Sequence, residues 1–313
     1  MKKLFFLAAA ASVMLAACSS DNEEAKVAEK SAIRLSTQSL TGMTRAGQSV
    51  QLTQFAADEN VGIFLAEDNA GSPVTSGTNV TPYAQPLTYV ADGAGNLANT
   101  QYWPQDGNGL HIFGVYPLAA ATTAAAYNAT GVTFTVAADQ TSDDNYKASD
   151  LMTGLPTLPL TNPVARTTAN VPMTFTHLLT KVDVNLSAGE GFTSTEMDAA
   201  VVSILGTKLT TTFDVQSTTV GAASGTAADI VAGTGTATSA IIVPQAIAAN
   251  TSFLKVTVGG GDYIYKLPAA TTFDAQTKYV FNITVNKTGL VLTTTEITDW
   301  TDGGATAGNA TLQ

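Results

Sequence analysis

Apolar and polar residues alternate with a period of two in several short stretches of the chain. In residues 182–186, Val182, Val184 and Leu186 fall on one face of an extended strand, and the polar residues between them fall on the other. The same alternation predicts further strands, at residues 132–136, 254–258, 263–267 and 281–285. None of these stretches has the 3.6-residue period of a helix, so the pattern predicts an all-β protein.

Two segments add detail to this prediction. Residues 259–262 read Gly-Gly-Gly-Asp between two predicted strands, and glycine readily adopts the positive φ values of a tight hairpin. Residues 110–116 are apolar at nearly every position and end at Pro117, which indicates a strand buried on both faces. Short strands separated by Gly, Pro, Asn and Asp clusters are typical of β-sandwiches.

The chain is long enough for two domains of ordinary size. Residues 158–172 contain Pro159, Pro163 and Pro172 and lose the alternation, so we place a linker near Thr167. Residues 216–239 consist mostly of Thr, Gly and Ala, whose small side chains bury little surface. We interpret this second stretch mainly as a long loop inside the second domain.

The first residues predict a signal peptide over residues 1–17. Lys2 and Lys3 precede an uncharged run that ends at Cys18, and its length of about 14 residues is short of the roughly 20 that cross a bilayer as a helix. The run ends Leu-Ala-Ala-Cys, which resembles the bacterial lipobox, in which the cysteine becomes lipidated. The alternative is that Cys18 is a signal-peptide residue without a role.

Charge and cysteine content exclude several classes of protein. Cys18 is the only cysteine, so no disulfide can form within the chain. The net charge is −11, and loss of Lys2 and Lys3 changes it to −11 − 2 = −13, which repels nucleic acid. Residues 19–24 are polar and acidic and predict a flexible tether.

Short motifs in a fixed order resemble those of the fimbrillin family, the type V pilins of Bacteroidetes. They are Tyr102-Trp103-Pro104, Tyr116-Pro117, Asp150-Leu151-Met152, the stretch from Phe175 to Val182, Ile242-Val243-Pro244-Gln245, the stretch from Lys278 to Val285, and Ile297-Thr298-Asp299-Trp300. The resemblance implies two transthyretin-like β-sandwich domains in tandem, which we place at residues 46–166 and 167–313. It also implies an outer-membrane lipoprotein that assembles into a fimbria at the cell surface, and the acidic tether resembles a surface-export signal of Bacteroidetes lipoproteins.

Residues 40–47 match the segment at which an arginine-specific protease cuts proteins of this family. The resemblance implies cleavage between Arg45 and Ala46, which would remove residues 18–45 together with the lipid and a strand-like segment at residues 32–37. The alternative is that Arg45 is an arginine in an exposed connection. Arg34 and Arg166 are competing sites, but the first lies in the predicted strand and the second in the predicted linker.

Loss of a strand from a sandwich leaves unpaired backbone groups and empty side-chain pockets, which a neighbouring subunit can fill. The candidate donor is residues 290–313, in which the large apolar groups are Leu290, Leu292, Ile297 and Trp300. Glycines at 303, 304 and 308 make the last residues poor strand formers. The segment could instead complete its own domain, which would make the chain a tip or anchor subunit.

No residue pattern predicts an enzyme, a cofactor or a metal site. His111 and His177 both lie in strand-like contexts, which favours packing roles, and two distant histidines do not form a zinc site. The carboxylates of Asp143, Asp144 and Asp150 do not match a calcium loop, and we expect them in a solvated loop.

A second functional hypothesis is a surface lipoprotein that binds glycans through exposed aromatic side chains. The candidates are Tyr83, Tyr89, Tyr102 and Trp103, although core packing is the better interpretation of Trp103.

Taken together, the two hypotheses predict four kinds of partner. They are other fimbrial subunits, an arginine-specific protease, the outer membrane through Cys18, and a host protein or glycan.

Overall fold

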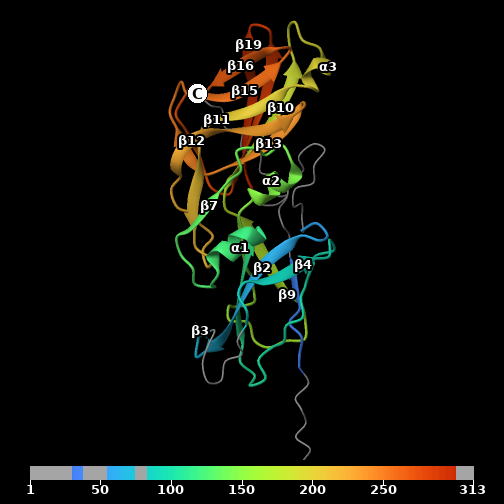
Figure 1. Ribbon diagram of the computed structural model, residues 1–313, viewed down its shortest axis with the longest axis vertical. Helices are drawn as coiled ribbons and strands as arrows, with labels where there is room; N and C mark the ends of the chain where they lie inside the picture. Colours follow the sequence, from blue (N-terminus) through green and yellow to red (C-terminus); the bar gives the residue numbers. More distant parts are fainter. Residues whose placement is uncertain (1–29, 38–54, 75–82, 301–313) are drawn as a thin grey trace, which may run out of the picture.

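The computed structural model describes residues 30–37, 55–74 and 83–300, which form nineteen strands and three short helices (Figure 1). The strands are β1 (Leu35–Thr37), β2 (Asn60–Asn69), β3 (Ser72–Val74), β4 (Leu87–Ala91), β5 (Asn96–Ala98), β6 (Leu110–Tyr116), β7 (Val132–Thr135), β8 (Met152–Pro156), β9 (Val171–His177), β10 (Thr180–Ala188), β11 (Val201–Phe213), β12 (Ser224–Thr234), β13 (Ala237–Ile242), β14 (Gln245–Ile247), β15 (Ser252–Val258), β16 (Gly261–Lys266), β17 (Thr271–Phe273), β18 (Thr277–Asn286) and β19 (Gly289–Asp299). The helices are α1 (Leu118–Ala124), α2 (Asp143–Ala148) and α3 (Ser194–Met197). The prediction of a mostly β protein is confirmed. Within the described residues, no helix is both long and apolar enough to cross a lipid bilayer.

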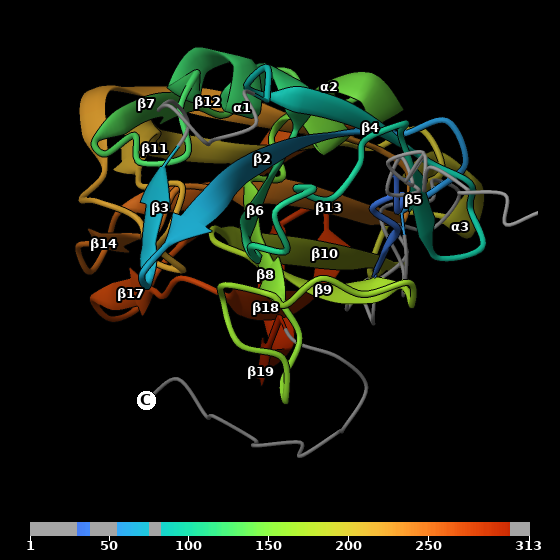
Figure 2. The same ribbon diagram turned by 90° about the horizontal axis from the view of Figure 1, so that it is seen from below.

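The first sheet closes on itself. Its strands are ordered β3-β2-β4-β5-β1-β9-β8-β6, and β2 also bonds to β6, so that seven strands form a barrel with β3 attached outside the ring. Figure 2 views this barrel from below, with the barrel strands in front. The sequence predicts a β-sandwich for this part of the chain. The sheet closes because β2 is long enough to pair with β4 at its start and with β6 further along.

The strand β6 is buried at every position, as its apolar sequence predicts. Leu110, Ile112 and Tyr116 belong to the barrel core. Phe113 and Val115 belong to a second, larger core, which continues into the other half of the molecule. A strand between two cores has no solvated face, and its sequence therefore does not alternate.

The second half of the chain is a sandwich of two sheets. One sheet has the order β13-β10-β18-β19, and the other has the order β12-β11-β15-β16 with β7 added to β11. Their inward residues, such as Val184, Phe281 and Val256, share one core. In the predicted hairpin between β15 and β16, Val258 pairs with Gly261, and Gly259 and Gly260 form the turn with φ of 58° and 78°.

Residues 216–239, expected mainly as a long loop, instead contain β12 and the first part of β13. This prediction was wrong because β12 needs little side-chain burial. It lies at a sheet edge and pairs with β11, and only its second half points apolar groups such as Ile230 into the core. Backbone hydrogen bonds, which do not depend on side-chain size, hold the rest of the strand.

Strand pairing crosses the expected boundary at residues 166 and 167 in both directions. The strand β7 precedes the boundary but pairs with β11 of the sandwich, and β9 follows it but pairs with β1 and β8 of the barrel. The division into residues 46–166 and 167–313, and the transthyretin-like character of the two parts, stay predictions.

Candidate strand-exchange site

The strand β1 fills a slot between β5 and β9 in the barrel wall. Leu35 is the Cα partner of Leu97 in β5 and also of Val171 in β9, the first pairing being antiparallel and the second parallel. The ladders are short, with two aligned residue pairs on the β5 side and three on the β9 side. Without β1, both neighbouring strands would have an unpaired edge.

Hydrogen bonds outside the strand proper extend this docking from Ser31 to Thr37. The Ile33 N–H donates to the Gln101 carbonyl at 2.8 Å, and the Trp103 N–H donates to the Ser31 carbonyl at 2.9 Å. On the other side, the Val171 N–H donates to the Arg34 carbonyl at 2.8 Å. The segment 31–37 therefore satisfies backbone groups on both walls of the slot.

The side chains of this segment alternate between the core and solvent from Ala32 to Leu35. Ile33 and Leu35 are 2% and 1% exposed and pack in the barrel core, whereas Ala32 and Arg34 are exposed. The slot therefore contains two apolar side-chain sites, separated by one position that faces solvent.

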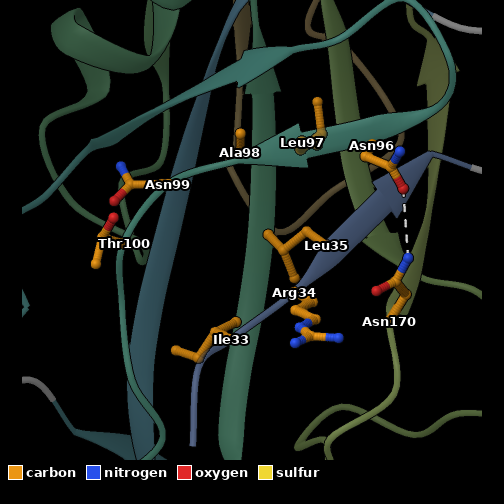
Figure 3. Close-up of a pocket in the computed structure, with 9 residues that line it drawn as sticks. All are labelled: Ile33, Arg34, Leu35, Asn96, Leu97, Ala98, Asn99, Thr100 and Asn170. Atoms are coloured by element: carbon orange, nitrogen blue, oxygen red, sulfur yellow. Dashed lines mark hydrogen bonds between the residues drawn. The ribbon is translucent and has the colours of Figure 1, made fainter.

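The ladder between β1 and β5 is interrupted opposite Arg34. Leu35 pairs with Leu97, and the Ile33 N–H bonds to the Gln101 carbonyl. Residues 98–100 between these two partners therefore lie opposite the single residue Arg34. An open cavity of about 430 Å³ adjoins this point (Figure 3). Its lining also includes Asn96 and Asn170, whose side-chain amides are hydrogen-bonded at 3.3 Å. The interruption reduces the number of backbone bonds that hold β1.

The predicted lipidation and cleavage residues, Cys18, Arg45 and Ala46, lie outside the described residues. In the sequence, Arg45 lies between Thr37, the last residue of β1, and Phe55, the first described residue after it. Phe55 is 1% exposed and belongs to the barrel core. A chain break at Arg45 would therefore separate β1 covalently from the rest of the barrel.

The donor-strand candidates lie in and just after β19, an edge strand that pairs with β18 from Gly289 to Asp299. Leu290, Leu292 and Ile297 are only half-buried against the sandwich core. In the structure this strand completes its own sheet, which is the arrangement that the sequence left as an alternative.

Trp300 ends the described chain at the junction of the two halves. It is 3% exposed, and its N–H donates to the Gln276 carbonyl at 2.7 Å. Its ring stacks on His177, the last residue of the barrel strand β9, and His177 Nδ1 lies 2.7 Å from Asp150 Oδ1. The junction thus contacts the end of β9 opposite to the slot.

Comparison with known protein families identifies the family of this chain. A family model described as fimbrillin-like matches residues 44–300. The chain belongs to the fimbrillin-like family. This is a family of fimbrial and cell-adhesion proteins of Bacteroidetes type, which are located at the cell surface and are not enzymes.

Solved structures share the fold of this fimbrillin-like chain. A candidate cell adhesion protein from Bacteroides uniformis is 23% identical with a TM-score of 0.64, over 87% of this chain and 98% of the other. A second one, from Bacteroides ovatus, is 16% identical with a TM-score of 0.62, over 88% of this chain and 99% of the other. No curated protein is similar enough in sequence to count as a match.

Both histidines of this fimbrillin-like protein are buried and have acidic partners. His111 is 5% exposed and lies 2.9 Å from Asp68, and His177 pairs with the fully buried Asp150. The sequence placed Asp150 in a solvated loop, which was wrong, and the pairing with His177 was missed because 27 residues separate the two in the chain. Within the described ranges, no group of three His, Cys, Asp or Glu residues could hold a metal ion.

Asp143 and Asp144 were also expected in a loop, and they instead form the first turn of α2. The Ser142 side chain accepts a hydrogen bond from the Asn145 N–H at 3.3 Å and caps the helix. Carboxylates in the first turn interact favourably with the helix dipole. A serine followed by two aspartates was therefore a helix-start signal.

Most of the aromatic side chains considered for glycan binding are buried. Tyr83, Tyr89 and Trp103 are 8%, 0% and 2% exposed, so they cannot form a binding platform at the surface. Tyr102 is 39% exposed, and Lys30 Nζ lies 5.7 Å from its ring centroid. The prediction that Trp103 is a core residue is confirmed.

Proposed function

We propose that this fimbrillin-like protein is a fimbrial subunit that polymerises by strand exchange after cleavage between Arg45 and Ala46. The observation that supports the proposal best is the position of β1, which fills a slot between two barrel strands and precedes Arg45 in the chain. The family match supports it further, since fimbrial proteins associate with other fimbrial subunits.

Loss of β1 would uncover two kinds of groups that water or a partner must satisfy. The Val171 N–H would lose its bond to the Arg34 carbonyl, and the Gln101 carbonyl would lose its bond from the Ile33 N–H. The sites of the Ile33 and Leu35 side chains would be empty. Unpaired backbone groups and apolar cavities are both costly in a folded protein. A strand from another subunit would restore both, and because donor and slot are different surfaces, the contact can repeat into an open filament.

We further propose export as a lipoprotein through the signal peptide at residues 1–17 and lipidation of Cys18. The lipid would hold the precursor at the outer membrane until an arginine-specific protease releases it. Cleavage at Arg45 would remove the lipid together with β1, so that the same event frees the subunit and opens its slot.

The test is expression of the full precursor with Arg45→Ala in a Bacteroidetes host. The expected result is a lipid-bearing monomer, whereas the unchanged protein has Ala46 as its N-terminus and forms a ladder on unboiled gels. Arg34→Ala and Arg166→Ala are the matched controls and should leave both results unchanged. An undiminished ladder from the Arg45→Ala protein would disprove cleavage at this position.

A tip or anchor subunit that does not donate a strand is the second candidate. It is favoured by the pairing of β19 with β18 along its whole length and by the burial of Trp300. Such a subunit would accept a strand but would not extend the filament beyond itself. Cleaved protein that stays monomeric alone but joins ladders formed by other subunits would support this candidate.

A further inference from the structure

The slot of β1 restricts which strand can occupy it. It encloses two aliphatic side chains two positions apart, Ile33 and Leu35, which are 2% and 1% exposed. Between them, Arg34 is exposed, and the two residues that follow, Ser36 and Thr37, are half-buried. The slot therefore accepts an aliphatic residue, an exposed residue, a second aliphatic residue and then a small polar residue.

The chain contains this pattern a second time, shortly after the proposed cleavage position. Residues 50–53 read Val-Gln-Leu-Thr, where residues 33–36 read Ile-Arg-Leu-Ser. Within residues 46–54, Val50 and Leu52 are the only large aliphatic residues, so a single alignment fills both sites of the slot. In this alignment residues 48–54, which lie outside the described residues, correspond to residues 31–37.

The direction of the chain fits this alignment. The strand β1 runs parallel to β9, and its last residue, Thr37, lies beside Met173. The next core residue of β9 is Phe175, whose ring centroid lies 5.1 Å from that of Phe55. Phe55 therefore lies at the end of the slot at which β1 ends. A segment that leads into Phe55 would enter the slot in the direction of β1, without a reversal.

The chain between the slot and Phe55 is also long enough. Leu35 lies beside Val171, and Phe175 is four residues further along β9, which corresponds to about 13 Å. Three residue steps lead from Leu52 to Phe55, and they span up to about 10 Å. The side chains of Phe55 and Phe175 cover the remainder. Leu52 can therefore reach the site of Leu35 while Phe55 keeps its contact in the barrel core.

We propose that, after β1 is removed, residues 48–54 of the same chain occupy its slot until a strand from another subunit displaces them. This inference rests on the strand-exchange function proposed above and adds a state between cleavage and polymerisation. Val50 and Leu52 take the sites of the two aliphatic side chains of β1, and Gln51 takes the exposed position between them.

Docking of the segment 48–54 would satisfy the backbone groups that β1 leaves behind. The Val50 N–H would donate to the Gln101 carbonyl, as the N–H of residue 33 does. The Gln51 carbonyl would accept from the Val171 N–H, as the carbonyl of residue 34 does. The slot would then present neither unpaired strand edges nor an apolar cavity to other proteins at the cell surface.

The segment 48–54 would bind less tightly than β1 at two points. Valine lacks one methylene group of isoleucine, so Val50 fills the site of Ile33 incompletely. Gln54 has no hydroxyl group to replace that of Thr37, which donates to the Gly95 carbonyl at 3.3 Å. The segment is nevertheless attached to the barrel, so that its docking is intramolecular and independent of protein concentration. It can therefore cover the slot as soon as β1 leaves and still be displaced.

Two cysteines in one chain test the alignment. Ser36 is the Cα partner of the exposed Asn96, and the proposed alignment puts Thr53 in the position of Ser36. Directly opposed residues of an antiparallel pair lie about 4.5 to 5.5 Å apart, which a disulfide can span. Cleaved chains contain no other cysteine, because Cys18 is removed with residues 18–45.

The full precursor with Asn96→Cys and Thr53→Cys is expressed in a Bacteroidetes host, and the surface and shed protein is oxidised and separated on a denaturing, non-reducing gel. The expected result is a disulfide between residues 53 and 96 within monomeric chains that begin at Ala46, identified by mass spectrometry of the linked peptides. Gln51→Cys replaces Thr53→Cys in the matched control and should give at least tenfold less linked monomer. The same two cysteines in an Arg45→Ala precursor should give no link, because β1 keeps the slot.

A second variant tests the effect on polymerisation. Val50→Asp puts a carboxylate into the apolar site of Ile33, which should prevent docking of the segment 48–54. Ladders on unboiled gels should then form at least twofold faster after cleavage. Gln51→Asp is the control, because it puts the carboxylate at the exposed position and should leave the rate unchanged. Both proteins are checked for an N-terminus at Ala46.

Each outcome decides the proposal. A link between residues 51 and 96 in place of 53 and 96 would overturn the alignment, and a link in uncut chains would show that removal of β1 is not required. Cleaved chains without either link, or equal ladder rates for Val50→Asp and the unchanged protein, would overturn the inference while strand exchange itself would stand. If the unchanged chain keeps the bond between Arg45 and Ala46, the proposed function fails and the inference fails with it.

Discussion

The indole ring of Trp300 stacks on the imidazole ring of His177, with the ring centroids 4.2 Å apart and the planes 10° from parallel. One residue follows the last strand of the sandwich, and the other ends a barrel strand whose first residues, Val171 to Met173, pair with β1. A single strand, β9, therefore runs from the proposed slot to the junction of the two halves. The C-terminal strand cannot leave its sheet completely without breaking this stack.

Trp300→Ala should lower the free energy of unfolding by about 3 to 5 kcal/mol, because it removes a large buried side chain and leaves a cavity over His177. Urea unfolding of the uncut precursor measures the change. Val291→Ala is the control, since Val291 is 55% exposed and near the other end of the same strand. A surface change of this kind should stay within about 0.5 kcal/mol. Equal effects of the two substitutions would show that Trp300 does not hold the junction.

Leu35→Ala in an uncut Arg45→Ala precursor should weaken the docking of β1 by about 2 to 5 kcal/mol, because Leu35 is 1% exposed in the barrel core. The Val171 amide, which bonds to the Arg34 carbonyl, should then exchange its hydrogen faster. Arg34→Ala is the control, because its side chain is exposed while its backbone bond is kept. Unchanged exchange at Val171 in the Leu35→Ala protein would argue against β1 as a separable strand.

Tyr89→Phe should leave stability unchanged or raise it. The Tyr89 hydroxyl is buried without a hydrogen-bond partner, and burial raises the pKa of this phenol above its ordinary value. Tyr83→Phe, by contrast, should lower stability by about 1 kcal/mol, because the Tyr83 hydroxyl donates to the Tyr102 carbonyl at 2.8 Å. Thermal unfolding of the two variants tests the difference, and a more damaging Tyr89→Phe would contradict it.

Lys278 should make stability rise with pH in the alkaline range. Burial disfavours its charged ammonium and lowers its pKa, an effect that Lys181 reinforces and that Asp183 and Glu296 oppose. Because the folded pKa lies below the unfolded value of about 10.4, the unfolded chain binds more protons between the two, and deprotonation favours folding. The burial cost is present in full below the folded pKa and is lost as the pH rises to the unfolded value.

Urea unfolding at pH 7.5 and pH 10 would measure this effect against Lys278→Met, which keeps the length of the side chain without the charge. Relative to that variant, the unchanged protein should gain stability at the higher pH. A constant difference, or a relative loss at pH 10, would contradict the direction of the shift.

Features that depend on local pattern were predictable from the sequence. Alternation in residues 182–186 and 281–285 identified β10 and β18, and the glycines after Val258 identified the hairpin turn, because a pleated strand repeats its environment every two residues. The strand-like segment at residues 32–37 was identified as well, and it contains β1. The same reasoning failed for β12, whose small side chains carry almost no alternation although its backbone pairs with β11.

The sequence by itself thus determined the class of the fold, several of its strands and, through ordered motifs, the fimbrillin family. Only the tertiary structure decided that β1 lies between β5 and β9, that the first sheet closes into a barrel, and that Trp300 meets His177. These relationships join residues that are distant along the chain. Their register depends on the free energy of the whole assembled core, which no local pattern of apolar and polar residues encodes.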